Sequence, residues 1–135
     1  MLSEDVMSRA SLVSSIAEDL RTEMLRLPGE FAFWAAQYAA VKRDHARLRL
    51  AAKETRGATY TAVRFSSTTV KITEAALEAA LDCDKACMSA KAAECDAEAD
   101  VAYLYNLLEA LRIKRDALVQ LASTERQEMR ASIEQ

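Results

Sequence analysis

Glycine and proline, the residues that most often interrupt helices, are nearly absent from this chain. The 135 residues include one proline, Pro28, and two glycines, Gly29 and Gly57. So few helix breakers leave little room for hairpins or for a many-stranded sheet. The sequence therefore predicts an all-α fold of long helices with helical-hairpin and coiled-coil packing, in a single helical domain over residues 1–135.

Groups that carry catalysis are also scarce. The single histidine, His45, lies on an apolar helix face, where a structural histidine is far commoner than a general base. No glycine-rich phosphate loop is present, and the three cysteines, Cys83, Cys87 and Cys95, lack a fourth zinc ligand close in sequence. The closely spaced acids are more typical of a solvated face than of a calcium loop. We therefore expect a protein that is not an enzyme and that holds no metal or cofactor.

Long apolar runs are missing as well. The longest stretch without a charge, Phe31–Val41, has eleven residues, about half of the ~20 that a membrane helix needs. The N-terminus lacks the basic and apolar regions of a signal peptide. An odd number of cysteines without a secretory signal is best explained by free thiols in a reducing compartment. We therefore expect a cytoplasmic protein with no membrane partner.

Alanine is the residue that the chain has in excess. It fills 27 of 135 positions, so the hydrophobic share of 51% overstates the apolar area that can be buried. A monomeric core made from so much alanine would be thin. The composition therefore favours self-association, and we expect a homo-oligomer.

Apolar residues recur at helical spacing in the first half of the chain. A first amphipathic helix is predicted over 9–27, within an N-terminal segment 1–28 that ends at Pro28-Gly29. A second helix is predicted over 30–56, with Gly57 as its C′ residue. Its apolar positions alternate at spacings of three and four, as in a seam that packs on a partner helix; they are Phe31, Trp34, Tyr38, Val41, His45, Leu48 and Ala52.

Residues 57–73 and 74–130 are predicted to differ in character. Between 57 and 73 many residues are β-branched or aromatic, which lowers helix propensity and predicts an irregular connection with one short strand or hairpin. Thr73 is predicted to cap a short helix that ends near Leu81, and a turn over 82–84 lets Asp84 cap the next helix.

The last predicted helix covers 85–130 and would be some 70 Å long at about 1.5 Å per residue. Its seam consists of Ala97, Val101, Leu104, Leu108, Leu111, Arg115, Leu118 and Ala122. Because Arg115 occupies a seam position, we expect a buried guanidinium that needs an acid partner. Together with Arg112 and Lys114 it forms a secondary basic cluster, which is a second candidate site for a polyanion.

The charge of the chain is sorted into two blocks. Residues 42–71 carry eight Lys or Arg against two acids, a balance of +6, while residues 72–102 carry eight acids against two Lys, a balance of −6. The formal net charge of −3 hides this separation. A basic block beside an acidic one is typical of a protein that holds a polyanion on one surface and another partner elsewhere.

The basic block supplies the candidate nucleic-acid residues. At 100° per residue, Lys42, Arg49, Lys53 and Arg56 agree within about 60° and form one stripe along the second helix. Cations that follow phosphates, with aromatic rings on which bases can stack, are the parts of a single-strand binding groove. The candidates are Lys42, Arg43, Arg47, Arg49, Lys53, Arg56, Tyr60, Arg64, Phe65 and Lys71. The alternative is a solvated basic face that pairs with the acidic block of the same chain.

The chain also resembles a known family. The run Trp34-x6-Val41-Lys42-Arg43-Asp44 and the stretch from Lys71 to Met129 are similar to phage recombination mediator proteins of the UvsY type. The resemblance covers roughly residues 30–130 and leaves the first helix outside it. In this alignment the family's late Lys-x-Arg pair falls on Gly57 and Thr59, so nearby cations would have to take over its role.

What the resemblance implies is specific. Such proteins bind single-stranded DNA, form hexameric or heptameric rings, and help a RecA-like recombinase to displace the single-strand binding protein. The protein would then be encoded by a phage and act in the cytoplasm of the host cell. Two alternatives from other classes stay open: a coiled-coil structural or scaffolding oligomer without DNA binding, and a small adaptor that captures one protein partner.

Overall fold

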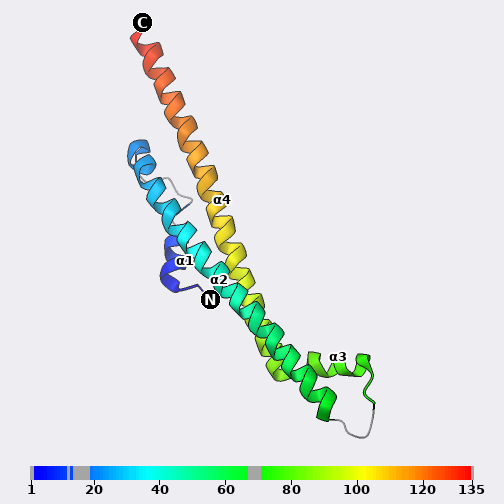
Figure 1. Ribbon diagram of the computed structural model, residues 1–135. Coiled ribbons are helices and arrows are strands. Elements are labelled where there is room, and N and C mark those ends of the chain that lie inside the picture. Colours follow the sequence, from blue (N-terminus) through cyan, green and yellow to red (C-terminus); the bar gives the residue numbers. More distant parts are fainter. Residues whose placement is uncertain (1, 12, 14–18, 67–70, 135) are drawn as a thin grey trace. The chain divides into compact units, whose positions relative to one another are not determined.

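The computed structural model describes residues 2–11, 13, 19–66 and 71–134, and all regular structure within them is helical. These residues form α1 (Glu4–Ser11), α2 (Leu20–Ser66), α3 (Glu74–Cys83) and α4 (Lys85–Ile133) (Figure 1). The predicted all-α class with long helices is confirmed. Among the described residues no helix is both long and apolar enough to cross a membrane.

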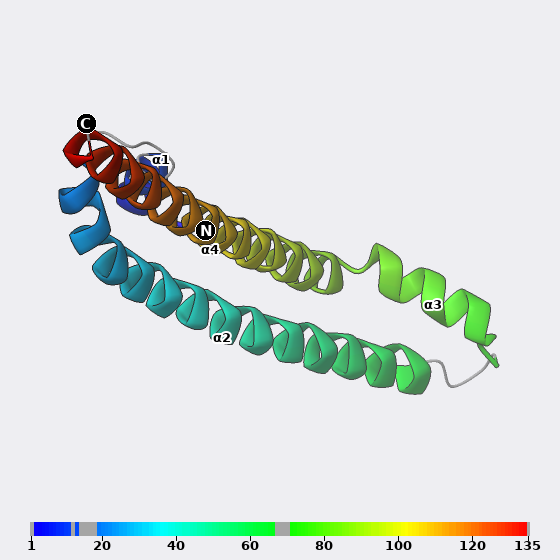
Figure 2. The ribbon, with the colours of Figure 1, turned by 90° about the horizontal axis from the view of Figure 1, so that it is seen from above.

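The chain divides into two compact units. Unit 1 consists of Ala40–Val101, and unit 2 consists of Leu2–Ala39 together with Ala102–Gln135. Unit 1 therefore contains the C-terminal part of α2, all of α3 and the start of α4 (Figure 2). Unit 2 contains α1, the N-terminal part of α2 and the rest of α4. In each unit the α2 and α4 segments run antiparallel, as in a helical hairpin.

The predicted first helix over 9–27 is wrong. A short helix ends at Ser11, and α2 begins at Leu20; part of the predicted span, residues 12 and 14–18, lies outside the described residues. Asp19 is the N-cap of α2, since its Oδ1 accepts the Thr22 N–H at 3.1 Å and its Oδ2 accepts the Thr22 hydroxyl at 2.7 Å. The Thr22 side chain is the main cause of a lowered pKa at Asp19. The apolar periodicity across 9–27 concealed this start signal.

The predicted helix end at Pro28-Gly29 is wrong too. Pro28 lies inside α2, and Figure 2 shows the first turns of the helix bent relative to the rest. Proline removes one hydrogen bond and bends a helix without always ending it. The tertiary contacts on both sides are strong enough to continue the helix: Glu23 and Trp34 are both buried. The Trp34 indole is fully buried and donates to Glu30 at 3.1 Å.

Gly57 does not end α2 either. The prediction of an irregular connection over 57–73 is therefore wrong for residues 57–66, which are helical. The helix continues to Ser66, and no described glycine has a positive φ, so Gly57 is not a left-handed cap. Residues 67–70 lie outside the described residues, and 71–73 have no regular structure. Thr59, seven residues after Ala52, and Val63, four residues after Thr59, are half-buried and continue the seam. This buried face overrides the low intrinsic helix propensity.

The predictions for α3 and α4 are confirmed in their main points. Thr73 caps α3 by accepting the Ala76 N–H at 3.3 Å, and Asp84 caps α4 by accepting the Cys87 N–H at 2.9 Å. The predicted turn over 82–84 is limited to Asp84, since α3 extends to Cys83. The long helix is unbroken through its 49 residues.

The core of unit 2 contains four leucines of α4 and Trp34 of α2, and Ala10 and Val13 are buried as well. Leu104, Leu111 and Leu118 follow one another at spacings of seven and are each at most 1% exposed. Unit 2 also holds α1 against α2, since Arg9 pairs with Glu30 at 2.9 Å. The Arg9 guanidinium lies 3.8 Å from the centre of the Phe33 ring.

The expectation of a buried Arg115 is wrong. Arg115 is 58% exposed and pairs with the adjacent Asp116, whereas Lys114 is 11% exposed and pairs with the buried Glu23 at 2.7 Å. Leu111 and Leu118, on either side of Lys114 and Arg115, are each 1% exposed, so the buried seam continues past Arg115. The nearly buried cation is Lys114, because it reaches the buried Glu23 of α2.

Candidate nucleic-acid interface

The cations of α2 form a longer stripe than the sequence predicted. Because the helix continues to Ser66, Tyr60 and Arg64 lie on the same face as Lys42, at 100° per residue. The basic stripe, as we define it, consists of Lys42, Arg49, Lys53, Arg56, Tyr60 and Arg64, which agree within about 80°. All five cations in it are exposed, and Tyr60 is half-buried. The stripe spans about 33 Å along the axis of α2.

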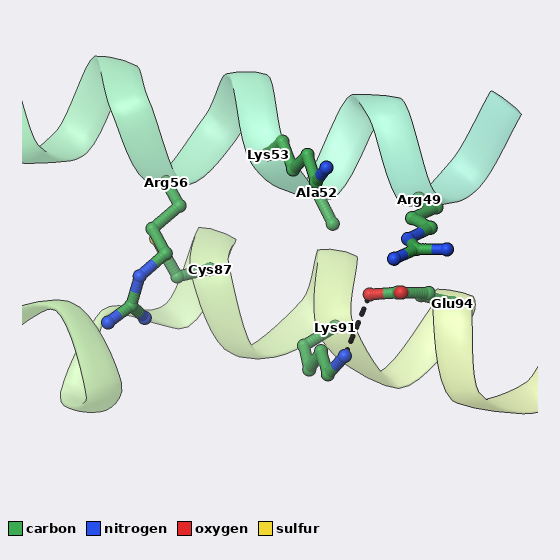
Figure 3. Close-up of a pocket in the computed structure, with 7 residues that line it drawn as sticks. All are labelled: Arg49, Ala52, Lys53, Arg56, Cys87, Lys91 and Glu94. Carbon is green, nitrogen blue, oxygen red and sulfur yellow. Dashed lines mark hydrogen bonds and ion pairs between the residues drawn. The ribbon is translucent and has the colours of Figure 1, made fainter. Parts of the chain in front are cut away.

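The middle of the stripe borders a groove in unit 1. This basic groove has a volume of about 350 Å³ and is lined by Arg49, Ala52, Lys53 and Arg56 of α2 and by Cys87, Lys91 and Glu94 of α4 (Figure 3). Four cations and one carboxylate give the lining a formal charge of +3, counted as four minus one. Such a lining attracts phosphates, since low-dielectric walls concentrate the positive potential.

Glu94 is the one acid in the basic groove, and its surroundings keep it ionised. Lys91 donates to its Oε2 at 2.9 Å, and Figure 3 shows the Arg49 side chain extended toward the same carboxylate. The pKa of Glu94 lies below its ordinary value, mainly because of the hydrogen bond from Lys91, with smaller contributions from Arg49 and His45. The same hydrogen bond raises the pKa of Lys91. At neutral pH Glu94 therefore offsets part of the positive charge in the groove.

The C-terminal end of the basic stripe is covered by an acidic face of α3. Arg56 pairs with Glu78 and, at 3.1 Å, with Asp82, while Arg64 pairs with Glu74 at 2.7 Å. The three acids recur at spacings of four, so they lie on one face of α3. The carboxylates raise the pKa of both guanidiniums, chiefly through the hydrogen bonds with Asp82 and with Glu74. The basic and acidic blocks thus meet within unit 1.

Tyr60 belongs to this arrangement. Its hydroxyl accepts a hydrogen bond from Arg64 at 2.5 Å, and the Arg64 guanidinium lies 5.7 Å from the centre of its ring. A ring that is half-buried and already stacked against an arginine offers only part of its face to a base. Phe65, the other candidate aromatic residue, is 77% exposed and lies on a different face of α2.

The remaining candidates of the basic block are dispersed. Arg43 and Arg47 are exposed, but they lie about 100° and 140° around α2 from Lys42. Arg47 pairs with Asp44 at 3.6 Å. Both residues of this pair line a second hollow of about 390 Å³ with Val41, Leu48, Ala97 and Asp100. Lys71 is exposed in the non-helical residues before α3.

The structure does not bring the secondary basic cluster together as a binding surface. Arg112 pairs with Glu109 on the same helix, and Arg115 pairs with Asp116. Lys114 points into the core of unit 2, where it holds Glu23. Each of the three cations is therefore neutralised by an acid of unit 2.

Two features of the site were not predicted from the sequence. Lys91 and Cys87 line the basic groove, although both were assigned to the acidic block or to packing. Their spacing of four, followed by Glu94 after three more residues, places all three on one side of α4 and was a usable signal. The second feature is which residues pair: the sequence left pairing of the basic block with the acidic block as an alternative, and the structure shows it at Arg56 and Arg64.

Metal-binding and redox groups do not gather in the part of the chain that the structure describes. No group of three or more His, Cys, Asp or Glu side chains there is arranged to hold a metal ion. His45 is half-buried on the seam of α2. The three thiols are free, with Cys87 buried beside the basic groove and Cys83 and Cys95 exposed.

Comparisons with protein-family models, with curated protein sequences and with solved structures gave no match for this chain.

Proposed function

We propose that this chain binds single-stranded DNA through the basic stripe and the basic groove. The observation that carries the proposal is the groove itself, where Arg49, Lys53, Arg56 and Lys91 converge from two helices. Convergent cations that are only partly balanced by one carboxylate suit a chain of phosphates better than a single small anion, because the stripe continues beyond the groove in both directions.

The binding would be electrostatic and multivalent. A subunit that offers the stripe would contact about three to five phosphates, and such binding is weak at cellular salt. An oligomer repeats the stripe, and the second and later contacts then form at a high effective concentration. A homo-oligomeric ring, hexameric or heptameric as the family resemblance implies, is the form in which this surface works best.

The biological role that we propose is that of a recombination mediator. It rests on the resemblance of residues 30–130 to mediator proteins of the UvsY type, together with the charge distribution. In this role the protein loads a RecA-like recombinase on single-stranded DNA and displaces the single-strand binding protein, without catalysis, in the cytoplasm. The acidic and apolar surfaces away from the stripe would then serve protein partners.

A structural role in a coiled-coil oligomer without DNA binding is the second candidate function. It is favoured by large apolar side chains that α4 exposes in unit 2, since such side chains are often covered by another subunit. Ile113 is 70% exposed, Val119 50% and Ile133 83%. This function predicts self-association and no affinity for oligonucleotides.

A binding experiment separates the two functions. Fluorescence anisotropy with a labelled oligo(dT) of about 30 nucleotides, at low and at moderate salt, measures affinity and its salt dependence. Replacing Arg49→Ala and Lys53→Ala together should weaken binding about tenfold or more and flatten the salt dependence. The matched control, Arg126→Ala with Arg130→Ala, removes the same charge from exposed positions on α4 and should leave most of the affinity.

The mass of the protein should be measured in the same buffers by light scattering. An oligomer without any affinity for the oligonucleotide at low salt would overturn the DNA-binding proposal and support the structural one. Equal losses in the groove variant and in the control would show that binding follows net charge and not the groove.

A further inference from the structure

We propose that α3 is an internal competitor for DNA, because its acidic face occupies the arginines at one end of the basic stripe. This inference rests on the proposed single-strand binding and specifies how the same surface is regulated. Glu74, Glu78 and Asp82 stand where phosphates of a bound strand would stand. These carboxylates would determine the affinity for a strand and the length of strand that the protein contacts.

The geometry of the ion pairs supports this role. Arg56 sends Nη1 to Asp82 and Nη2 to Glu78, so its two terminal nitrogens are engaged by two different carboxylates. Arg64 uses Nη1 for Glu74 at 2.7 Å. Arginine recognises carboxylate and phosphate oxygens with the same fork of N–H donors. A phosphate that approaches either guanidinium therefore competes directly with α3.

The ion pairs are exposed enough to be exchanged. The Arg56 side chain is 44% exposed, and its partners Glu78 and Asp82 are 55% and 69% exposed. Arg64 and Glu74 are 51% and 68% exposed. Ion pairs in contact with water are screened by salt and contribute little to stability. Exchanging a carboxylate for a phosphate at these sites replaces one charged acceptor by another and buries no uncompensated charge.

The attachment of α3 does not depend on these ion pairs alone. Leu77 and Leu81, one turn apart on α3, are each 1% exposed. Apolar burial of this kind keeps a helix of 10 residues folded, since an isolated helix of that length is marginal in water. The apolar side of α3 can therefore hold the helix in unit 1 while its carboxylates release the arginines.

Two classes of cation follow from this arrangement. Arg49, Lys53 and Lys91 of the basic groove are exposed and lie outside the ion pairs that α3 makes among the described residues, so they are open to a short strand. Arg56 and Arg64 become available only when phosphates displace the carboxylates. A long strand, or a strand held by several subunits, supplies the effective concentration that such displacement needs. We therefore infer that α3 makes the protein discriminate between short and long single strands.

The test neutralises the acidic face while keeping the helix. The variant Glu74→Gln, Glu78→Gln, Asp82→Asn should bind oligo(dT) about three- to tenfold more tightly than the unmodified protein at moderate salt. A charge-matched control, Asp96→Asn, Glu125→Gln, Glu128→Gln, neutralises three exposed acids of α4. It should change affinity much less. Circular dichroism shows whether helical content is kept, and the single variant Glu78→Gln should give a smaller gain in the same direction.

A double-variant cycle assigns the gain to the arginines. With a short oligo(dT) of about ten nucleotides, Arg56→Ala with Arg64→Ala should weaken binding only slightly in the unmodified protein, but should abolish the gain in the α3-neutralised variant. A gain that equals that of the charge-matched control, or that persists without both arginines, would overturn the role of α3 and leave the groove as the binding site. Absence of binding by every form at low salt would instead overturn the DNA-binding proposal and this inference with it.

Discussion

Units 1 and 2 use the same helices for different purposes. In unit 2 the buried positions of α4 are large, Leu104, Leu108, Leu111 and Leu118, and the ion pair of Lys114 with Glu23 is almost removed from water. In unit 1 the buried positions of α4 are small, Cys87 and Ala97, and the ion pairs between α2 and α3 are about half-exposed. Apolar burial along α4 is thus concentrated in unit 2, whereas exchangeable charge lies in unit 1, where the large buried residues are Leu77 and Leu81 of α3.

This difference indicates which part of an alanine-rich helical chain is suited to form a binding surface. Burial of a leucine face stabilises the folded state by about 25 cal/mol per Å² of apolar area removed from water. Side chains buried in this way are not available to bind a partner. Small buried residues hold two helices together while long charged side chains remain outside, where they can change partners. The predictions below test this contrast between the two units.

The largest expected effect is the loss of a leucine from the core of unit 2. Leu111→Ala should lower the free energy of unfolding by about 3 kcal/mol, because Leu111 is 1% exposed and its removal leaves a cavity. Cys87→Ala, at a buried position of α4 in unit 1, should lower it by only about 1 kcal/mol, because a smaller apolar side chain is removed. Urea denaturation followed by circular dichroism measures both. Similar losses in the two variants would refute the contrast.

An intermediate effect is expected from the ion pair of unit 2. Lys114→Met removes the ammonium 2.7 Å from the Glu23 carboxylate. Because both side chains are nearly buried, the variant should lose about 2 kcal/mol of stability at neutral pH. Arg130→Met, at an exposed position of α4, serves as the control and should have no measurable effect.

The smallest effect concerns the pH response of the basic groove. The pKa of Glu94 is lowered from its ordinary value of 4.5, chiefly by the hydrogen bond from Lys91. The stabilisation from this pair is therefore present above pH 4.5 and is lost as the pH falls through the lower pKa of the folded state. In Lys91→Met the pKa of Glu94 should rise, which NMR titration of the side-chain carboxyl can follow. An unchanged pKa would show that Arg49 or His45 dominates instead.

The sequence allowed most of the fold to be predicted where local signals and packing agree. Thr73 and Asp84 are side-chain caps whose chemistry does not depend on distant residues, and α3 and α4 begin where they predict. The ends of α2 were missed because proline, glycine and β-branched residues are weak local signals. The buried face that continues past Ala52 to Thr59 and Val63 outweighs them.

The candidate site was predicted in part. The stripe of Lys42, Arg49, Lys53 and Arg56 follows from helical periodicity alone, and the structure keeps these residues on one face. The contribution of Lys91 and the pairing of Arg64 with Glu74 depend on which helices lie side by side. Periodicity within one helix does not contain that information. The exposure of Arg115 and the burial of Lys114 were missed for the same reason, since Glu23, the acid that Lys114 pairs with, lies on another helix.

Hydrogen exchange with and without oligo(dT) shows which unit binds DNA, since it reports on both units in one experiment. The account predicts that saturating DNA at low salt changes the exchange of α2 residues 42–66 and of α3, with Glu74–Cys83 exchanging faster as its carboxylates release Arg56 and Arg64. The α4 residues of unit 2, from Ala102 onward, should be unaffected. Changes confined to unit 2, or no change with DNA bound, would contradict the assignment of the binding surface to unit 1.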